Sequence, residues 1–401
     1  MFVNAKIYKN ILAPAVITNI VWLLLLIIYN TVDHGLRPLS DYFYWIVLIW
    51  NLGFTIGSCL INKLYLPVHG SMTMLNRHRI GSILLWVMIL SLLLSIYGLY
   101  LIGSSLNPGN IFAGIRQNSV SILNGEEPSV ILPIYISMAQ SIASYSVVVI
   151  GTLFFFRGNK SFAVKIALSL IILYTLFRSN KLSVVQVLFF ISTLVILKNN
   201  ISKKMIFYFL IAFLIMMLGA HLMRAGGDKA AEFDLGKMLA VYLLSPLPAF
   251  DIVSTSNTVL IEDFNGEYTF RAFIPYLNLL GFNLVGNSDP FNLHFWTNTP
   301  LPVNVYTVFF SFHTDFGIYG IVFASLFYGI FFGILWKGCK KKIPMFQVAY
   351  ASCFYILAFQ FFADYLFMFF WTNALTLLFI FFFFTHFSFG HLLSAKKYRY
   401  A

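Results

Sequence analysis

The sequence predicts an all-α polytopic membrane protein of about ten transmembrane helices with one large loop outside the membrane. Of its 401 residues, 60% are apolar, 18% aromatic and only 10% charged, whereas a soluble domain is about 45–50% apolar and about 25% charged. Stretches close to the roughly 20 apolar residues that cross a bilayer recur along the chain. These observations exclude a soluble globular protein.

Ten apolar stretches are the expected spans. The first follows Lys6 and Lys9 as in a signal peptide, but it is too long for a signal-peptide core and is followed by further spans, so we expect an uncleaved helix. The fifth and sixth are short and form a predicted helical hairpin that turns at residues 178–181. In order, the spans are 11–29, 43–62, 80–103, 130–156, 162–177, 182–197, 205–222, 318–336, 345–362 and 366–387.

The distribution of charge predicts the orientation. With both termini in the cytoplasm, 18 of the 26 Lys and Arg residues lie on the inner side, as the positive-inside rule requires. All 14 Asp and Glu residues then lie outside with the other eight cations, so the net charge of +12 divides into +18 inside and 8 − 14 = −6 outside. The positive charge therefore predicts an orientation in the lipid bilayer and does not indicate a nucleic-acid partner.

The spans divide the chain into three parts. Residues 1–222 form a bundle of about seven helices, residues 223–317 form the large outer loop, and residues 318–401 form a closing bundle of about three helices. The loop carries nine of the 14 carboxylates, and its apolar stretch at 238–244 predicts an interfacial or re-entrant helix. A loop of this length on a membrane bundle indicates a binding or catalytic role.

Cations on the outer side depart from the orientation rule and need a reason. Guanidinium groups offer a planar fork of donors and ammonium groups a point charge, both suited to a phosphate or pyrophosphate head group. The alternative is that they reach lipid phosphates or pair with loop carboxylates. The candidate pyrophosphate ligands are Arg116, Arg178, Lys181, Arg224 and Arg271.

The segment before the eighth span carries candidate acid–base groups. Pro300 and Pro302 predict a helix start, and a helix running from there to Trp336 exceeds the bilayer, so we expect projection outward or a bend near Gly317. Asp315 then lies near the outer interface, where it or His313 could take a proton from a sugar hydroxyl. The alternative is that Asp315 caps or hinges the helix and His313 is an ordinary interfacial residue.

The sequence lacks several common catalytic motifs. It has no Asp-x-Asp pair, no His-Glu-x-x-His, no Gly-Lys-Thr phosphate loop and no Gly-x-Ser-x-Gly elbow. Its three cysteines show no CxxC spacing and no Cys/His cluster. We therefore predict no metal site and no cofactor.

A short motif supplies a resemblance to a known family. Asn304-Val305-Tyr306-Thr307, followed by Asp315-Phe316-Gly317 and Gly320, resembles the signature of bacterial oligosaccharide repeat-unit polymerases, the O-antigen polymerases of the Wzy kind. Arg224, Tyr242 and residues 246–250 also resemble that family, as does the order of spans and outer loop.

The resemblance implies a multispanning, GT-C-like glycosyltransferase of the bacterial inner membrane, related to O-antigen ligases. Donor and acceptor oligosaccharides would both be carried on undecaprenyl pyrophosphate, and a chain-length regulator protein would be a possible partner. By the motif, Arg224 and Asp315 match the family pattern, while Asn304 and Tyr306 become candidate sugar contacts. The alternatives are a ligase that transfers glycan to lipid A core and a flippase of the same lipid-linked oligosaccharide.

Overall fold

The computed structural model describes residues 12–63, 78–123, 130–157, 162–178, 181–198, 243–256, 266–284, 297–299 and 302–397. The described residues are helical apart from loops and one short antiparallel pair, β1 (Thr297–Asn298) and β2 (Pro302–Val303). The chain divides into two compact units. Unit 1 comprises Met1–Gly70 and Asp234–Leu378, and unit 2 comprises Ser71–Phe233 and Phe379–Ala401.

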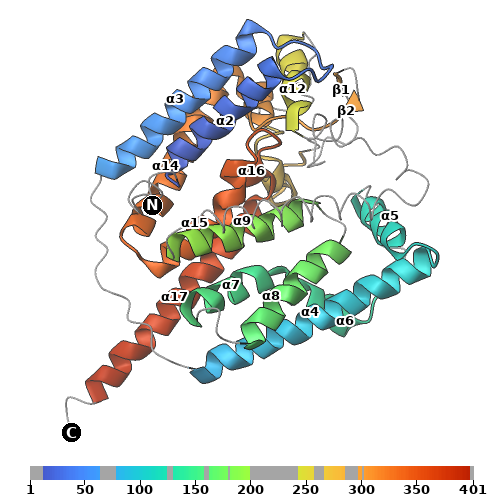
Figure 1. The fold of residues 1–401 in the computed structure, drawn as a ribbon, viewed down its shortest axis with the longest axis vertical. Helices are drawn as coiled ribbons and strands as arrows, with labels where there is room; N and C mark the ends of the chain where they lie inside the picture. The colour runs from blue at the N-terminus through green and yellow to red at the C-terminus, as the bar shows by residue number, and fades with distance from the viewer. Residues whose placement is uncertain are drawn as a thin grey trace. The chain divides into compact units, whose positions relative to one another are not determined.

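Unit 1 is built around one long helix, α14, along which α3 runs (Figure 1). The first connection, between α2 and α3, is short, so these helices pack as neighbours. The other elements come from the second half of the chain. The described elements of unit 1 are α2 (Pro14–Thr31), α3 (Asp41–Lys63), α12 (Pro246–Thr255), η3 (Arg271–Phe273), α13 (Ile274–Leu279), α14 (Phe309–Lys340), α15 (Pro344–Ala358), α16 (Tyr365–Met368) and the beginning of α17 (Phe370–Lys397).

Small residues let the backbones of α3 and α14 approach closely. A Cβ on Gly57 would overlap the carbonyl oxygen of Leu326, and a Cβ on Gly329 would overlap that of Phe54. Apolar helices gain no hydrophobic energy by leaving lipid for one another, so contact between backbones is a main source of their association in a membrane. The α3–α14 pair is therefore the framework on which the rest of unit 1 is placed.

The predicted bend in the long helix is confirmed. Gly317 has φ 59° and ψ −145° inside α14, a conformation open almost only to glycine. The predicted helix start was wrong, because Pro302 belongs to β2 and the helix begins at Phe309. The amide of Val308, immediately before the helix, donates to the carbonyl of Gln360 at 2.7 Å. This hydrogen bond joins the start of α14 to the connection between α15 and α16.

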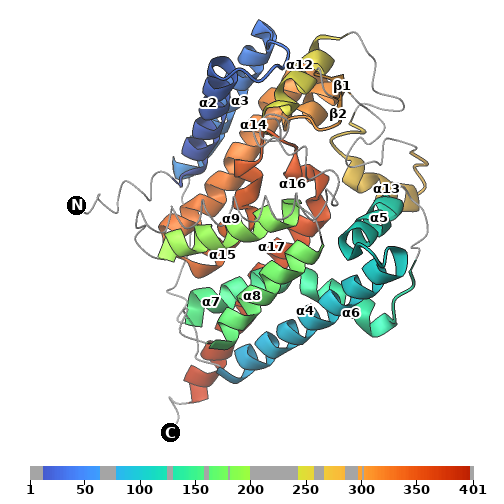
Figure 2. The same ribbon diagram turned by 45° about the vertical axis from the view of Figure 1, so that its right-hand side comes forward.

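Unit 2 packs around the long helix α4, with α8 beside it (Figure 2). Its core includes the buried side chains of Leu92, Ile150 and Ile171. The predicted short hairpin is present as α8 and α9. The described elements are α4 (His78–Leu106), α5 (Ile111–Leu123), α6 (Ile134–Ser144), α7 (Ser146–Arg157), α8 (Phe162–Phe177), α9 (Lys181–Lys198) and the end of α17.

Among the described residues, four helices are long and apolar enough to cross a membrane: α2, α3, α4 and α14. The pair α6 and α7, bent by 52°, would make a fifth span if the two count as one. The apolar helices α8, α9, α15 and α17 match further predicted spans in position but have apolar parts of only 10–17 residues. The predicted span 205–222 lies outside the described residues. The described residues therefore support a multi-pass membrane protein with four or five spans, and they do not show all ten of the predicted ones.

Candidate functional site

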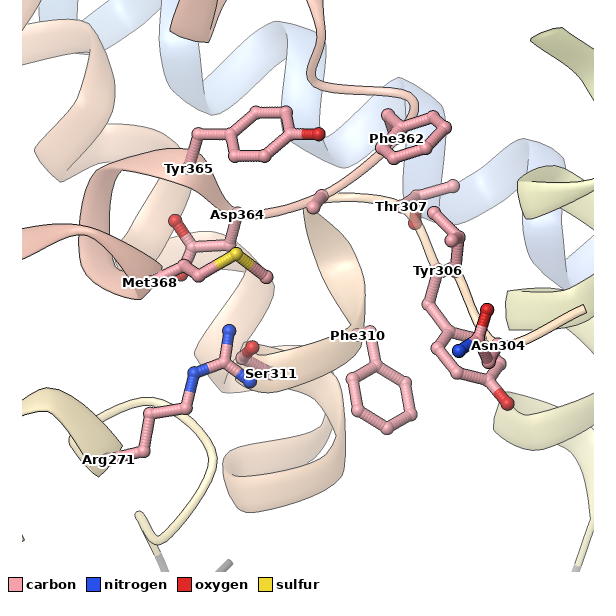
Figure 3. A pocket seen from close by; sticks show the side chains of 12 residues that line it. Arg271, Asn304, Tyr306, Thr307, Phe310, Ser311, Phe362, Asp364, Tyr365 and Met368 are labelled. Atoms are coloured by element: carbon pink, nitrogen blue, oxygen red, sulfur yellow. The ribbon is translucent and has the colours of Figure 1, made fainter. Parts of the chain in front are cut away.

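Unit 1 contains a small pocket that gathers several polar side chains from distant parts of the sequence (Figure 3). Its volume is about 50 Å³, where about 10–15 Å³ is enough to hold one water. Its walls are η3, the segment before α14, the first turn of α14 and the connection from α15 to α16. The lining residues are Arg271, Asn304, Val305, Tyr306, Thr307, Phe310, Ser311, Phe362, Ala363, Asp364, Tyr365 and Met368.

Arg271 enters this pocket from a loop that Asp315 holds in place. The carboxylate of Asp315 accepts the backbone N–H groups of Tyr268 at 3.3 Å and Thr269 at 2.6 Å. The hydroxyl of Thr269 also donates to the carbonyl of Ser311 at 3.3 Å. These bonds fix the loop to α14 immediately before η3, and Arg271 is only 6% exposed. Asp315 therefore acts on the pocket through the backbone that carries Arg271.

Asp364 faces Arg271 across the pocket in the connection between α15 and α16 (Figure 3). Its Oδ1 accepts the backbone N–H of Phe367 at 3.1 Å and so caps α16. The same oxygen accepts the hydroxyl of Tyr328 from α14. Two helices thus hold this carboxylate in one position.

Gln360, fully buried, ties this connection to the first two helices. Its side-chain oxygen accepts the indole N–H groups of Trp22 at 3.2 Å and Trp50 at 2.8 Å, and its amide donates to Thr18 at 2.9 Å. Its backbone carbonyl accepts the amide of Val308, next to the segment that carries Asn304 and Tyr306. One buried residue, through its side chain and its backbone, therefore fixes two walls of the pocket against α2 and α3.

Asn304 and Tyr306, the predicted sugar contacts, both line the pocket. The ring of Tyr306 stacks on Phe310 with centroids 4.4 Å apart, and its hydroxyl shares a hydrogen bond of 2.9 Å with Thr297. Burial raises the pKa of Tyr306, although the hydrogen bond with Thr297 acts to lower it. Tyr306 is thus a neutral aromatic wall, while half-buried Asn304 offers an amide with both donors and an acceptor.

An apolar groove of about 700 Å³ lies against the same stretch of α14. The segment from Thr269 to Arg271 separates the two spaces, because Thr269 and Phe270 line the groove whereas Arg271 lines the pocket. Exposed aromatic residues of α14 continue the groove along the helix. Its lining residues are Thr269, Phe270, Phe312, Asp315, Phe316, Tyr319, Gly320, Phe323, Ala324, Phe327 and Phe367.

His313 lies on another side of α14. Its Nε2 is 2.8 Å from the hydroxyl of Tyr42, and its ring meets that of Phe250 edge-on at 5.5 Å. It lines neither the pocket nor the groove. The two predicted acid–base residues are therefore not brought together.

The other predicted cations belong to unit 2 or lie outside the described residues. Arg116 on α5 and Arg178 after α8 are exposed, and Arg178 lies over the ring of Tyr174 at 5.8 Å. Phe112 of α5 and Phe177 of α8 bring these two segments together, with ring centroids 5.4 Å apart. Lys181 begins α9. Arg224 lies outside the described residues.

The balance of charge in the pocket rests on one carboxylate and one guanidinium. Burial raises the pKa of Asp364 to about 6, although the hydrogen bond from Tyr328 and the charge of Arg271 act to lower it. Asp364 lies outside the apolar helices on either side of it. A pocket with these groups can hold an anion at Arg271 and accept a proton at Asp364. Among the described residues, no group of three or more His, Cys, Asp or Glu side chains could hold a metal ion.

The sequence arguments missed Asp364, Ser311 and Tyr328, and they noted Thr307 only as part of the motif. A usable signal existed for Asp364, which is a lone carboxylate in the apolar stretch between two closing helices, where ionisable residues are rare and tend to be functional. No comparable signal marks Ser311 or Tyr328. Comparison with known proteins gives no relative, since no protein-family model, no curated protein and no solved structure matches the chain.

Proposed function

We propose that the chain is a polymerase of lipid-linked oligosaccharides in the bacterial inner membrane. It would transfer the growing glycan from one undecaprenyl pyrophosphate to the acceptor repeat on another, at the periplasmic face, to build O-antigen or a related surface polysaccharide. Undecaprenyl pyrophosphate would be released, and a chain-length regulator protein is a possible partner. The proposal needs no metal or cofactor, because arginine can stabilise the departing pyrophosphate.

The observation that supports this function best is that the short segment from Thr269 to Arg271 lines two unlike spaces. Arg271 lines the pocket with Asn304 and Asp364, whereas Thr269 and Phe270 line the apolar groove along α14. A polyprenyl pyrophosphate has the same division, with an apolar chain joined to an anionic head that carries sugar. The groove would take part of the chain, and the guanidinium would bind the head through charge-assisted hydrogen bonds.

The depth of the pocket supports a reaction at the membrane surface. The part of α14 after Gly317 runs for 23 residues (340 − 317) to Lys340, or about 35 Å at 1.5 Å a residue. That length already crosses the roughly 30 Å hydrocarbon core. Phe310 and Ser311, which line the pocket, precede Gly317 and so lie at the outer end of the span in the proposed orientation.

Reconstitution in vesicles tests the function. The probe is the lipid-linked repeat unit that accumulates in cells from which the gene for this chain has been deleted. Longer lipid-linked glycan supports the polymerase. Transfer only to lipid A core, or movement across the bilayer with no new bond, contradicts it in favour of a ligase or a flippase respectively.

Arg271→Ala is the first variant to compare with the wild type. We expect kcat to fall by about 100–1,000-fold, the effect typical of losing one donor to a developing anion. Arg37→Ala is the matched control, because Arg37 is another arginine of unit 1 that is exposed and absent from the pocket. Arg116→Ala and Arg224→Ala test two further predicted ligands in the same assay. Normal chain-length ladders in Arg271→Ala, Arg116→Ala and Arg224→Ala would contradict the pyrophosphate role of these arginines.

A further inference from the structure

Asp364 has an oxygen that the fold does not use. The residue is only 3% exposed, and its Oδ1 accepts from Tyr328 and Phe367. Its Oδ2 is buried and finds no hydrogen-bond partner among the described residues. Leaving a buried polar atom without a partner is unfavourable, because the atom loses its hydrogen bonds to water and gains none in return. Such an atom in a pocket needs an explanation, and a role in binding or catalysis is one.

The groups around this carboxylate set when it carries a proton. Arg271 points toward it from the opposite wall (Figure 3). The other titratable side chains that line the pocket are Tyr306 and Tyr365, and Tyr328 of α14 donates its hydroxyl to Asp364. With a pKa of about 6, Asp364 is ionised at neutral pH but close to its titration range. A base with a pKa near the working pH transfers protons most efficiently.

Asp315 and His313, the bases predicted from the sequence, are less well placed than Asp364, and so is Tyr306. Both carboxylate oxygens of Asp315 accept backbone N–H groups, those of Tyr268 and Thr269. His313 lines neither the pocket nor the groove. Tyr306 keeps its proton at neutral pH because burial raises its pKa. Asp364 alone among these groups combines a place in the pocket with an oxygen that has no partner within the described part of the chain.

Resting on the polymerase function proposed above, we infer that Asp364 is the catalytic base and shares Arg271 with the leaving group. Oδ2 accepts the proton of the acceptor hydroxyl while the hydroxyl oxygen bonds to the anomeric carbon of the donor. The bond from that carbon to the pyrophosphate oxygen breaks, and its electron pair leaves with the pyrophosphate. Asp364 becomes neutral as the pyrophosphate gains one negative charge, and the proton later returns to water.

This exchange explains why a carboxylate and an anion-binding arginine share one pocket. Before the reaction, the charge of Arg271 stabilises the carboxylate. As the proton reaches Asp364, that attraction ends and the guanidinium can stabilise the new charge on the pyrophosphate. The net charge of the pocket stays constant while the negative charge moves, so the interaction is stronger in the transition state than in the ground state.

Asp364→Asn tests the assignment because the amide keeps the shape and an acceptor for Tyr328. We expect kcat to fall by about 100-fold or more, the usual contribution of a general base. Binding of undecaprenyl pyrophosphate, measured as a thermal shift, should remain or tighten, because the variant removes a negative charge beside Arg271. The control is Asp251→Asn. Asp251 is another buried carboxylate, which accepts the backbone N–H of Ser40 and does not line the pocket.

The pH profile gives a readout that a structural role would not produce. Wild-type kcat should fall as the pH drops through about 6, where Asp364 takes up its proton, and this acid limb should be missing from the residual activity of Asp364→Asn. Tyr328→Phe removes a donor that favours the ionised carboxylate, so it should move the limb to higher pH. Asp251→Asn should leave the limb in place.

The outcomes separate this inference from the proposed function. If the wild type does not lengthen lipid-linked glycan, the polymerase proposal fails and the role of Asp364 fails with it. If the wild type lengthens glycan and Asp364→Asn matches its kcat, only the base is wrongly assigned. Should Asp364→Asn fail to fold, an unshifted acid limb in Tyr328→Phe overturns the inference by itself.

Discussion

Asp315 and Asp364 are buried carboxylates of the same unit with opposite bonding. Asp315 binds two backbone N–H groups of the loop before Arg271, whereas Asp364 leaves Oδ2 without a partner among the described residues. A carboxylate held by backbone donors is suited to fixing a loop, and one with an unused oxygen is suited to exchanging a proton. The hydrogen bonds of each carboxylate therefore indicate its role better than its presence in, or absence from, the sequence motif.

Asp315→Asn should loosen the loop and leave the acid–base chemistry in place. An amide has one acceptor oxygen, and its NH₂ would face a backbone donor, so we expect a loss of about 1–3 kcal/mol in stability. The affinity for undecaprenyl pyrophosphate should fall because Arg271 is no longer fixed. Hydrogen exchange at the amides of Tyr268 and Thr269 and the melting temperature measure the first effect. An acid limb lost while those amides stay protected would show instead that Asp315 is the base.

At this scale the sequence predicts residue types better than their partners. Arg271, Asn304 and Tyr306 were expected to bind substrate and do line one pocket. The bond between Thr269 and Asp315 joins residues 46 apart, and nothing in their local pattern indicates it. His313 was grouped with Asp315 because they are neighbours in sequence, but two residues along a helix point about 200° apart at 3.6 residues a turn.

Among the elements, α14 determines most of the site. Its bend at Gly317 was predictable because the apolar run exceeds the membrane thickness and a glycine lies at the interface. The sequence also carries glycines and a serine at intervals of four, at Gly53 and Gly57 in α3 and at Ser325, Gly329 and Gly333 in α14. This spacing is typical of close helix pairs in membranes. The start of α14 was not predictable, since it depends on the bond from Val308 to Gln360.

Gly317→Ala should disturb the site without touching it. The backbone at φ 59° and ψ −145° disfavours a side chain by about 1–3 kcal/mol. The chain can relieve that strain by straightening, which would move Ser311 and Asp315 relative to the span. We expect lower activity and a lower melting temperature. Gly109→Ala is the control, since a Cβ there meets only Asn107 at 3.7 Å; equal effects of the two changes would argue against a special role for the bend.

On the scale of the whole molecule, composition identifies a membrane protein and the structure agrees through its long apolar helices. The number of spans is less well determined. The pairs α6–α7 and α8–α9 lie where the sequence predicts three spans, and their apolar segments are broken or short. Hydropathy counts apolar residues but does not show whether a short helix crosses the membrane or packs within a bundle.

Cysteine labelling can test the predicted orientation. In a background with Cys59, Cys339 and Cys353 replaced, Gly109→Cys lies in a predicted outer loop and Lys341→Cys in a predicted inner loop; both positions are exposed. A membrane-impermeant maleimide should label Gly109→Cys in intact spheroplasts and Lys341→Cys only after permeabilisation. The reverse labelling pattern would show that the orientation is opposite to the predicted one, with the pocket on the cytoplasmic side.

The bonds of Gln360 also impose an order on synthesis. Trp50 emerges from the ribosome 310 residues before its partner, which at 5–20 residues a second is about 15–60 s. During that time Thr18, Trp22 and Trp50 on α2 and α3 still lack their hydrogen-bond partner Gln360. The first segment of unit 2, Ser71–Phe233, is synthesised in the same interval. The pocket is therefore completed late, only after the connection between α15 and α16 that carries Gln360 and Asp364 has been made.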